Sequence, residues 1–145
     1  RSANKYVVIF GTGSEIYQND LILWRNIMSW IKTKDQRQHY TKLSVANGPG
    51  HMITTQIIDC DEELLGKGRL FKEITLEKDC GVGYHVHEGD AEIYVIQSGE
   101  AEYNDNGEIK IVRAGDVTFT GSGEGHSLTN KKDEPVKFVA LVIYE

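Results

Sequence analysis

The stretch from Gly83 to Glu92 carries the residues best suited to chemistry. It reads Gly-Tyr-His-Val-His-Glu-Gly-Asp-Ala-Glu, with two histidines separated by one residue. On a β-strand, residues two apart point to the same face and lie about 6.6 Å apart along the chain. His85 and His87 therefore project side by side, and both imidazoles can bind one metal ion. The Gly-Asp corner that follows can turn the chain so that Glu92 returns beside the pair.

A second glycine-rich stretch offers another imidazole. Residues 115–126 read Gly-Asp-Val-Thr-Phe-Thr-Gly-Ser-Gly-Glu-Gly-His, and such a turn can deliver His126 onto a strand as a third imidazole ligand. A His-x-His pair alone would not establish a metal site, because surface strands carry solvated pairs too. The pair followed by Glu92 and then by His126, in this order on a strand-rich chain, favours a metal site.

The expected ligand set suggests which metals the site would bind. Three imidazoles and one carboxylate suit one divalent transition metal: Mn(II), Fe(II), Ni(II), Co(II), Cu(II) or Zn(II). Four protein ligands in an octahedral shell leave two adjacent positions for water, substrate or dioxygen. A structural zinc site would favour closed coordination by thiolates, and Cys60 and Cys80 lie away from the ligands in sequence. We therefore expect an open, functional site, with His39 and His51 as bystanders.

Two functions of different classes fit such a site. The first is a metal-dependent enzyme of the dioxygenase, isomerase or lyase type that acts on a small polar molecule. In that case a neighbouring group would move the proton while a substrate oxygen is polarised. The alternative is a non-catalytic protein that binds a small molecule or metal as a sensor or store, and a purely structural metal comes third. No residue can be assigned a catalytic role from the sequence.

Further pocket candidates lie on neighbouring strands. Tyr94 should point inward beside the carboxylate ligand. Arg69, Phe71 and Glu73 alternate on one face of a predicted strand over residues 69–77. The register of that strand decides whether they line the cavity or an exterior interface. An inward Arg69 would favour an anionic substrate.

Short strands must position these residues. Runs rich in Ile, Val, Thr, Tyr and Phe alternate with Gly, Asp and Asn, and Asn104-Asp105-Asn106-Gly107 is a hairpin turn. Many short, evenly spaced strands with no helix between them predict an all-β sandwich, jelly roll or barrel. The predicted strands cover residues 51–58, 69–77, 82–87, 92–98, 100–104, 108–113, 117–120, 126–129 and 136–144.

The chain divides near the turn signal Asn-Gly-Pro-Gly at residues 47–50. Residues 1–46 are expected to form an N-terminal extension, and residues 47–145 the β-barrel domain. Apolar residues at helical spacing predict a short helix over residues 19–33 of the extension. Because the chain begins without methionine, residues 1–4 are expected to derive from cloning.

The two motifs resemble those of the cupin superfamily, in the form of its small single-domain bacterial members. Gly99 joins His85, His87 and Glu92 in matching G-x5-H-x-H-x3,4-E-x6-G, and Gly115, Gly123, His126 and Asn130 match G-x5-P-x-G-x2-H-x3-N. The resemblance covers roughly residues 51–144. It implies a double-stranded β-helix, a jelly-roll-like barrel that is often a homodimer.

Two residues depart from these motifs. Asp79 replaces the first glycine, and aspartate tolerates a left-handed turn better than most residues. Gly121 replaces the proline of the second motif, which should loosen the loop before His126 because glycine has more backbone entropy to lose. Neither departure removes a candidate ligand.

Composition limits the classes of binding partner and the cellular compartment that we expect for the protein. A net charge of −6 argues against nucleic acid. No apolar run approaches the roughly 18 residues that a membrane span needs. Without an export signal, we expect a cytoplasmic location and reduced thiols at Cys60 and Cys80. The expected partner is therefore a small molecule.

Overall fold

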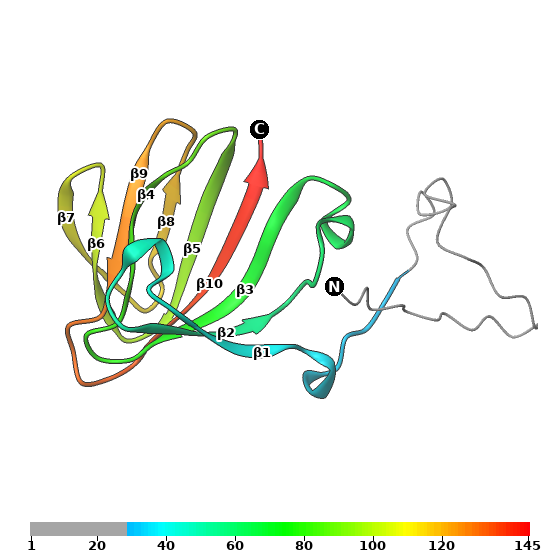
Figure 1. The fold of residues 1–145 in the computed structure, drawn as a ribbon, viewed down its shortest axis with the longest axis horizontal. Coiled ribbons are helices and arrows are strands. Elements are labelled where there is room, and N and C mark those ends of the chain that lie inside the picture. The colour runs from blue at the N-terminus through cyan, green and yellow to red at the C-terminus, as the bar shows by residue number, and fades with distance from the viewer. Residues whose placement is uncertain (1–28) are drawn as a thin grey trace, which may run out of the picture. The chain divides into compact units, whose positions relative to one another are not determined.

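Residues 29–145 are the part of the chain that the computed structural model describes, and residues 32–145 form one compact unit. The described part forms ten strands and three short 3-10 helices (Figure 1). The strands are β1 (His39–Leu43), β2 (His51–Gln56), β3 (Gly68–Leu76), β4 (Gly81–Val86), β5 (Asp90–Ser98), β6 (Glu100–Asp105), β7 (Glu108–Arg113), β8 (Val117–Thr120), β9 (Gly125–Thr129) and β10 (Val136–Tyr144). The 3-10 helices are η2 (Lys34–Gln36), η3 (Val45–Asn47) and η4 (Asp61–Leu64).

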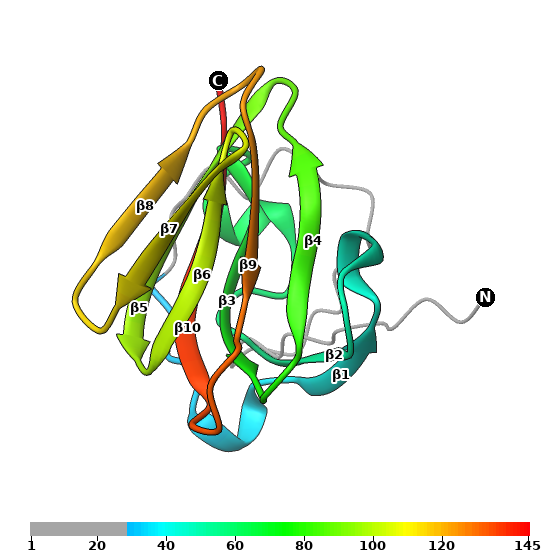
Figure 2. The ribbon, with the colours of Figure 1, turned by 90° about the vertical axis from the view of Figure 1, so that its left-hand side faces the viewer.

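The strands pair into two antiparallel sheets. One sheet has the order β1-β2-β3-β10-β5-β8, and the other has the order β4-β9-β6-β7. Figure 2 looks onto the smaller sheet, with β3 and β10 of the larger sheet behind it. Strands adjacent in space are mostly distant in sequence, as in a jelly roll. The expected all-β, double-stranded β-helix fold is confirmed.

The core lies between the inner faces of the two sheets. In β10, Val136, Phe138, Ala140 and Val142 are buried, and the residues between them are more exposed. This two-residue period follows from the strand pleat, which points alternate side chains to opposite faces. Burying a side chain such as Phe138 contributes about 1.5–3 kcal/mol. The packed core thereby holds the two sheets, and the ligands that each carries, at a fixed separation.

All the predicted strands are confirmed, with ends shifted by at most two residues. β1 is not among them, because its sequence His-Tyr-Thr-Lys-Leu lacks apolar alternation; it becomes an edge strand by pairing with β2. Its residues belong to the expected extension, and the boundary near residue 47 stays a prediction. The helix expected over residues 19–33 falls largely outside the described residues, and residues 29–33 are irregular.

Two smaller expectations concern the cysteines and the membrane. Both cysteines are free thiols, with Cys60 exposed and Cys80 buried. Among residues 29–145, no helix is long and apolar enough to cross a bilayer.

Candidate metal centre

Three strands and one turn position the four candidate ligands. His85 lies on β4, His126 on β9 and Glu92 on β5, and His87 directly follows the end of β4. The register of β4 with β9 places His85 directly opposite His126. Glu92 comes from the other sheet, so the cluster joins both sheets.

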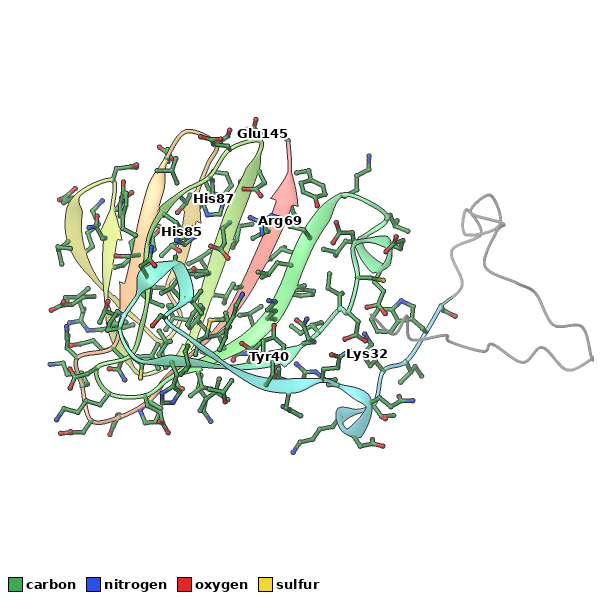
Figure 3. All side chains as sticks on the ribbon, viewed as in Figure 1. Lys32, Tyr40, Arg69, His85, His87 and Glu145 are labelled. Atoms are coloured by element: carbon green, nitrogen blue, oxygen red, sulfur yellow. The ribbon has the colours of Figure 1, made fainter. Side chains whose placement is uncertain are left out.

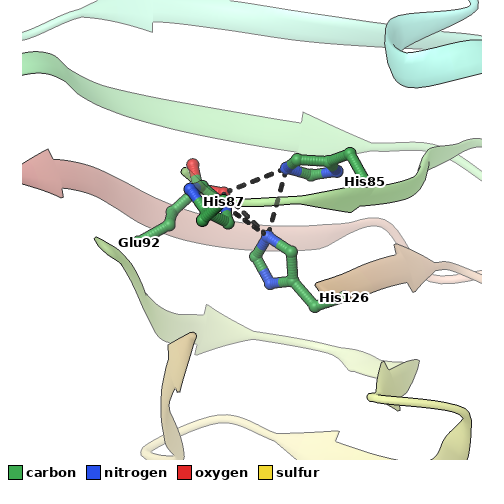
Figure 4. A group of neighbouring side chains, drawn as sticks. All are labelled: His85, His87, Glu92 and His126. Carbon is green, nitrogen blue, oxygen red and sulfur yellow. Dashed lines mark hydrogen bonds and ion pairs between the residues drawn. The ribbon is translucent and has the colours of Figure 1, made fainter. Parts of the chain in front are cut away.

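The four ligand atoms converge on one point (Figure 4). Nε2 of His126 lies 3.2 Å from Nε2 of both His85 and His87, and 2.9 Å from Oε2 of Glu92. The same carboxylate oxygen lies 3.5 Å from His85 Nε2 and 3.4 Å from His87 Nε2. Donors bound at about 2.1 Å to one ion in perpendicular directions would lie about 3.0 Å apart. The spacing therefore fits one metal ion.

Each imidazole is held through its other ring nitrogen, Nδ1. The partners are the Gly83 carbonyl oxygen for His85 (2.9 Å), Asp90 Oδ1 for His87 (2.6 Å), and the hydroxyls of Thr120 (2.9 Å) and Tyr103 (3.1 Å) for His126. When Nδ1 carries the proton, Nε2 presents a lone pair to the centre. Three lone pairs and a carboxylate oxygen cannot hydrogen-bond to one another, so this donor set fits a cation.

Both carboxylate oxygens of Asp90 accept a hydrogen bond. Oδ1 accepts from His87, and Oδ2 accepts from Nε of Arg69 at 2.7 Å. Figure 3 labels Arg69 and His87. Burial raises the pKa of Asp90, but the hydrogen bonds from His87 and Arg69 outweigh it and hold this pKa below its usual range. A carboxylate in this position orients a ligand imidazole and increases its basicity. Arg69 therefore supports His87 through Asp90.

Burial and charge act in opposite directions on the ligands. Burial raises the pKa of Glu92, but its contacts with three imidazoles outweigh burial and hold this pKa well below its usual range. In the metal-free protein, a protonated Nε2 can donate to Glu92, and this hydrogen bond raises the pKa of both His85 and His87, whereas burial lowers the pKa of His126. Glu92 is consequently ionised at neutral pH and supplies the negative charge that a divalent cation would meet.

The remaining pocket candidates lie on two different faces. Tyr94 is buried on the inner face, and its ring stacks on that of His126 with centroids 5.0 Å apart. Burial raises the pKa of Tyr94 well above its usual range, so its hydroxyl stays protonated. Phe71 and Glu73 lie on the outer face of β3, because Leu70 and Ile74, on the opposite face, pack in the core. Glu73 there pairs with Arg37 at 2.9 Å.

The loop before the third histidine is tied to the strand end that carries His87. The backbone N–H of Gly123 donates to the His87 carbonyl at 2.8 Å, and the His87 N–H donates to the Glu124 carbonyl at 3.0 Å. These reciprocal bonds offset the expected loosening of the loop. At the other motif departure, Asp79 has a φ of 58°, the left-handed conformation expected there.

Three residues that hydrogen-bond to the imidazoles are not predicted from the motifs or their spacing. Asp90 lies three residues after His87, and the Gly-Asp corner is a local signal that points to it. Tyr103 on β6 and Thr120 at the end of β8 reach His126 only through tertiary packing. No spacing rule connects either of them with the histidine motif.

The two-sheet barrel and its three-histidine, one-glutamate cluster are those of a cupin. The family model for the cupin domain matches residues 72–144, and the chain belongs to this family.

Both the curated proteins and the solved structures that resemble this chain include a match from Thermotoga maritima. The chain is 44% identical over 100 residues to an oxalate-binding protein from that organism, covering 69% of this chain and 82% of that protein. The crystal structure of a "predicted oxalate decarboxylase" from T. maritima is similar with a TM-score of 0.75 and 33% identity, covering 80% of this chain and 100% of that chain. A double-stranded β-helix protein from Klebsiella pneumoniae, with a TM-score of 0.55 and 24% identity over 68% of this chain and 78% of that chain, supports the fold alone.

Proposed function

We propose that the chain binds one divalent transition metal through His85, His87, Glu92 and His126, and binds a small carboxylate of the oxalate class at this site. The observation that carries the proposal is the convergence of three Nε2 atoms and one carboxylate oxygen within 4.8 Å. A bound ion supplies a positive centre with coordination positions for ligand oxygens. The names of the T. maritima relatives support this ligand class.

A binding role is favoured by the groups that contact the cluster. Asp90, Tyr103 and Thr120 each hydrogen-bond to an imidazole, and Tyr94 keeps its proton. Within residues 29–145, none of the side chains that hydrogen-bond to the cluster is a free acid or base that could transfer a proton. The alternative is a metal-dependent enzyme of the dioxygenase, isomerase or lyase type, which the decarboxylase name of one relative supports.

Metal analysis followed by calorimetry tests the proposal. Protein purified without a metal-affinity step should contain about one metal ion per chain, and His87→Ala should lose it. His39→Ala is the matched control, because His39 is exposed on β1 and lies outside the cluster. Metal content near zero in the wild type would overturn the proposal.

Ligand titrations then separate binding from turnover. Oxalate should bind the metal-loaded protein and not the metal-free protein. It should bind at least about tenfold more tightly than acetate, because two carboxylates can chelate one ion. Release of carbon dioxide from bound oxalate would favour the enzyme alternative. Equal affinity for oxalate with and without metal would contradict both.

We also propose that two copies of the chain form a homodimer. On the outer face of the larger sheet, Val117 is 64% exposed, Phe119 is 62% exposed and Val95 is 39% exposed. Such an apolar patch at edge strand β8 can pair with itself across a two-fold axis. Light scattering should give the mass of a dimer for the wild type and of a monomer for Phe119→Asp. A monomeric wild type would contradict this.

A cytoplasmic location and the absence of nucleic-acid and membrane partners complete the proposal. Free thiols at Cys60 and Cys80 are typical of a reducing compartment. The net charge of −6 does not favour binding to a phosphate backbone. Cell fractionation with an antibody against the chain tests the location.

A further inference from the structure

Strand β4 contains one residue more than its partner β9 in the stretch that leads to the metal cluster. Val82 pairs with Leu128 and His85 pairs with His126, so three steps along β4 match two steps along β9. An extra residue of this kind is a β-bulge, which changes the direction of the side chains that follow it. The bulge consists of residues 83 and 84.

The bulge turns two candidate ligands toward the inside of the barrel. Val82 is 4% exposed and packs in the core, and His85, three positions later, also points inward to the cluster. In a regular strand, residues three apart would lie on opposite faces. Beyond the bulge the alternation continues, because Tyr84 and Val86 are exposed and His87 is buried. Without the extra residue in a bulge, Val82 and His85 could not both face inward.

Gly83 in this bulge also contacts a ligand directly. Its carbonyl oxygen lies 2.9 Å from Nδ1 of His85 and accepts its hydrogen bond. The direction of this carbonyl therefore orients the imidazole, and with it the Nε2 lone pair that would face a metal ion.

The loop of residues 44–50, which contains η3, packs against the bulge and lies beside β4 in Figure 2. A β-carbon at Gly83 would clash with the carbonyl oxygen of Ala46 and would lie 2.6 Å from the backbone nitrogen of Gly48. A β-carbon at Gly48 would in turn clash with the backbone nitrogen of Gly83. Two backbones can approach this closely because both residues lack a side chain.

The same loop is held in an unfavourable backbone conformation. Ser44, Ala46 and Asn47 have φ values of 46°, 49° and 59°, in the left-handed region that residues with side chains rarely adopt. Such a conformation persists only where the surrounding structure imposes it. Here the loop packs on β4, and the Gly81 N–H donates to the Pro49 carbonyl at 2.9 Å. The contact with β4 therefore fixes both the loop and the bulge.

We propose that Gly83, together with the 44–50 loop packed against it, is a positioning element that directs Nε2 of His85 at the metal. It touches neither the ion nor a bound small molecule, and it acts through His85. The inference rests on the metal site of the proposed function and does not depend on which small molecule binds there.

Two alanine variants of the full chain disturb this contact from opposite sides. Gly83→Ala places a methyl group on the bulge, and Gly48→Ala places one on the loop. In competition with a chromophoric chelator, each should bind Zn(II) at least about tenfold more weakly than the wild type, the lower limit for loss of a partner that orients a ligand imidazole.

Gly99→Ala is the matched control for backbone crowding. A β-carbon at Gly99 would lie 2.8 Å from the carbonyl oxygen of Pro135, in the turn between β5 and β6 and away from the cluster. This variant should lower the free energy of unfolding in urea and change zinc affinity by less than about twofold.

A second background separates positioning from a general loss of stability. When His85→Ala is already present, Gly83→Ala should weaken zinc binding by less than about twofold, because the ligand through which it acts is absent. An effect on the fold as a whole would instead lower zinc affinity by the same factor in both backgrounds.

Hydrogen exchange in the wild type tests the coupling without any substitution. Metal binding and the loop conformation should stabilise each other, because coupling between two sites is reciprocal. The Asn47 and Gly48 N–H groups donate within the loop at 3.0 and 2.8 Å, and the Asp116 N–H donates at 2.9 Å in the turn before β8. On addition of Zn(II), exchange of the two loop amides should slow at least about fivefold more than exchange of the Asp116 amide.

Three results would contradict the positioning role. They are unchanged zinc affinity in folded Gly83→Ala and Gly48→Ala, an equal loss with and without His85, and loop exchange that zinc slows no more than exchange at Asp116. Each of them leaves the metal site in place as long as the wild type binds Zn(II). A wild type that binds no metal would remove the proposed function instead.

Discussion

Asp90→Asn tests whether the hydrogen bond behind His87 sets the metal affinity. Asparagine keeps the size of the side chain and removes its charge. The amide oxygen can still accept from Nδ1, but its ionic contact with Arg69 is lost. The amide N–H₂ can instead donate to Nδ1, which moves the imidazole proton to Nε2 and removes the lone pair from the centre. Both effects weaken the same ligand.

The structure gives the scale of this loss. Changing such a partner of a ligand imidazole costs about 10–100-fold in metal affinity, which is about 1.4–2.8 kcal/mol. The 2.6 Å contact is short, charge-assisted and buried, so we expect the upper half of that range. Loss of the ion pair with Arg69 should change the free energy of unfolding of the metal-free protein little. The Arg69 side chain is 45% exposed, and a surface ion pair contributes about 0–1 kcal/mol.

Competition with a chromophoric chelator for Zn(II) at fixed pH measures the affinity. Asp116→Asn is the matched control, because the Asp116 carboxylate accepts from the Arg113 backbone at 2.7 Å on an exposed turn. It removes the same charge without touching the cluster. If Asp90→Asn bound zinc as tightly as the wild type, the assigned role of Asp90 would be wrong.

Three further outcomes are expected. Tyr103→Phe removes a hydroxyl that contacts His126, and zinc affinity in the same assay should fall by the equivalent of about 1 kcal/mol. Phe138→Ala, at a 0% exposed position whose ring lies 4.7 Å from that of Tyr94, should lower the free energy of unfolding in urea by about 3–5 kcal/mol. Because the folded-state pKa of Glu92 is depressed, its stabilising contribution is present above its ordinary pKa of 4.5 and is lost as the pH falls. In metal-free protein, the stability advantage of the wild type over Glu92→Gln should therefore shrink as the pH falls below about 4.5 toward the depressed folded-state pKa.

The short-range features of the fold and site follow from the sequence. The two-residue period of a strand predicts that His85 and His87 share a face, and the Gly-Asp corner predicts the return of Glu92. The strand positions follow from the same period and from the turn residues between the strands. Each of these features depends on residues within about ten positions in the sequence. Over that range, the backbone geometry of a strand or turn determines which way each side chain points.

The tertiary structure decides which distant residues complete the site. The register of β4 with β9 places His126 opposite His85, and packing brings Tyr103 to its Nδ1. The same kind of pairing decides that Arg69 contacts Asp90. A shift of one residue in strand register would turn every side chain to the opposite face. Register is fixed by the packing of the whole core, so no local stretch of sequence contains that information.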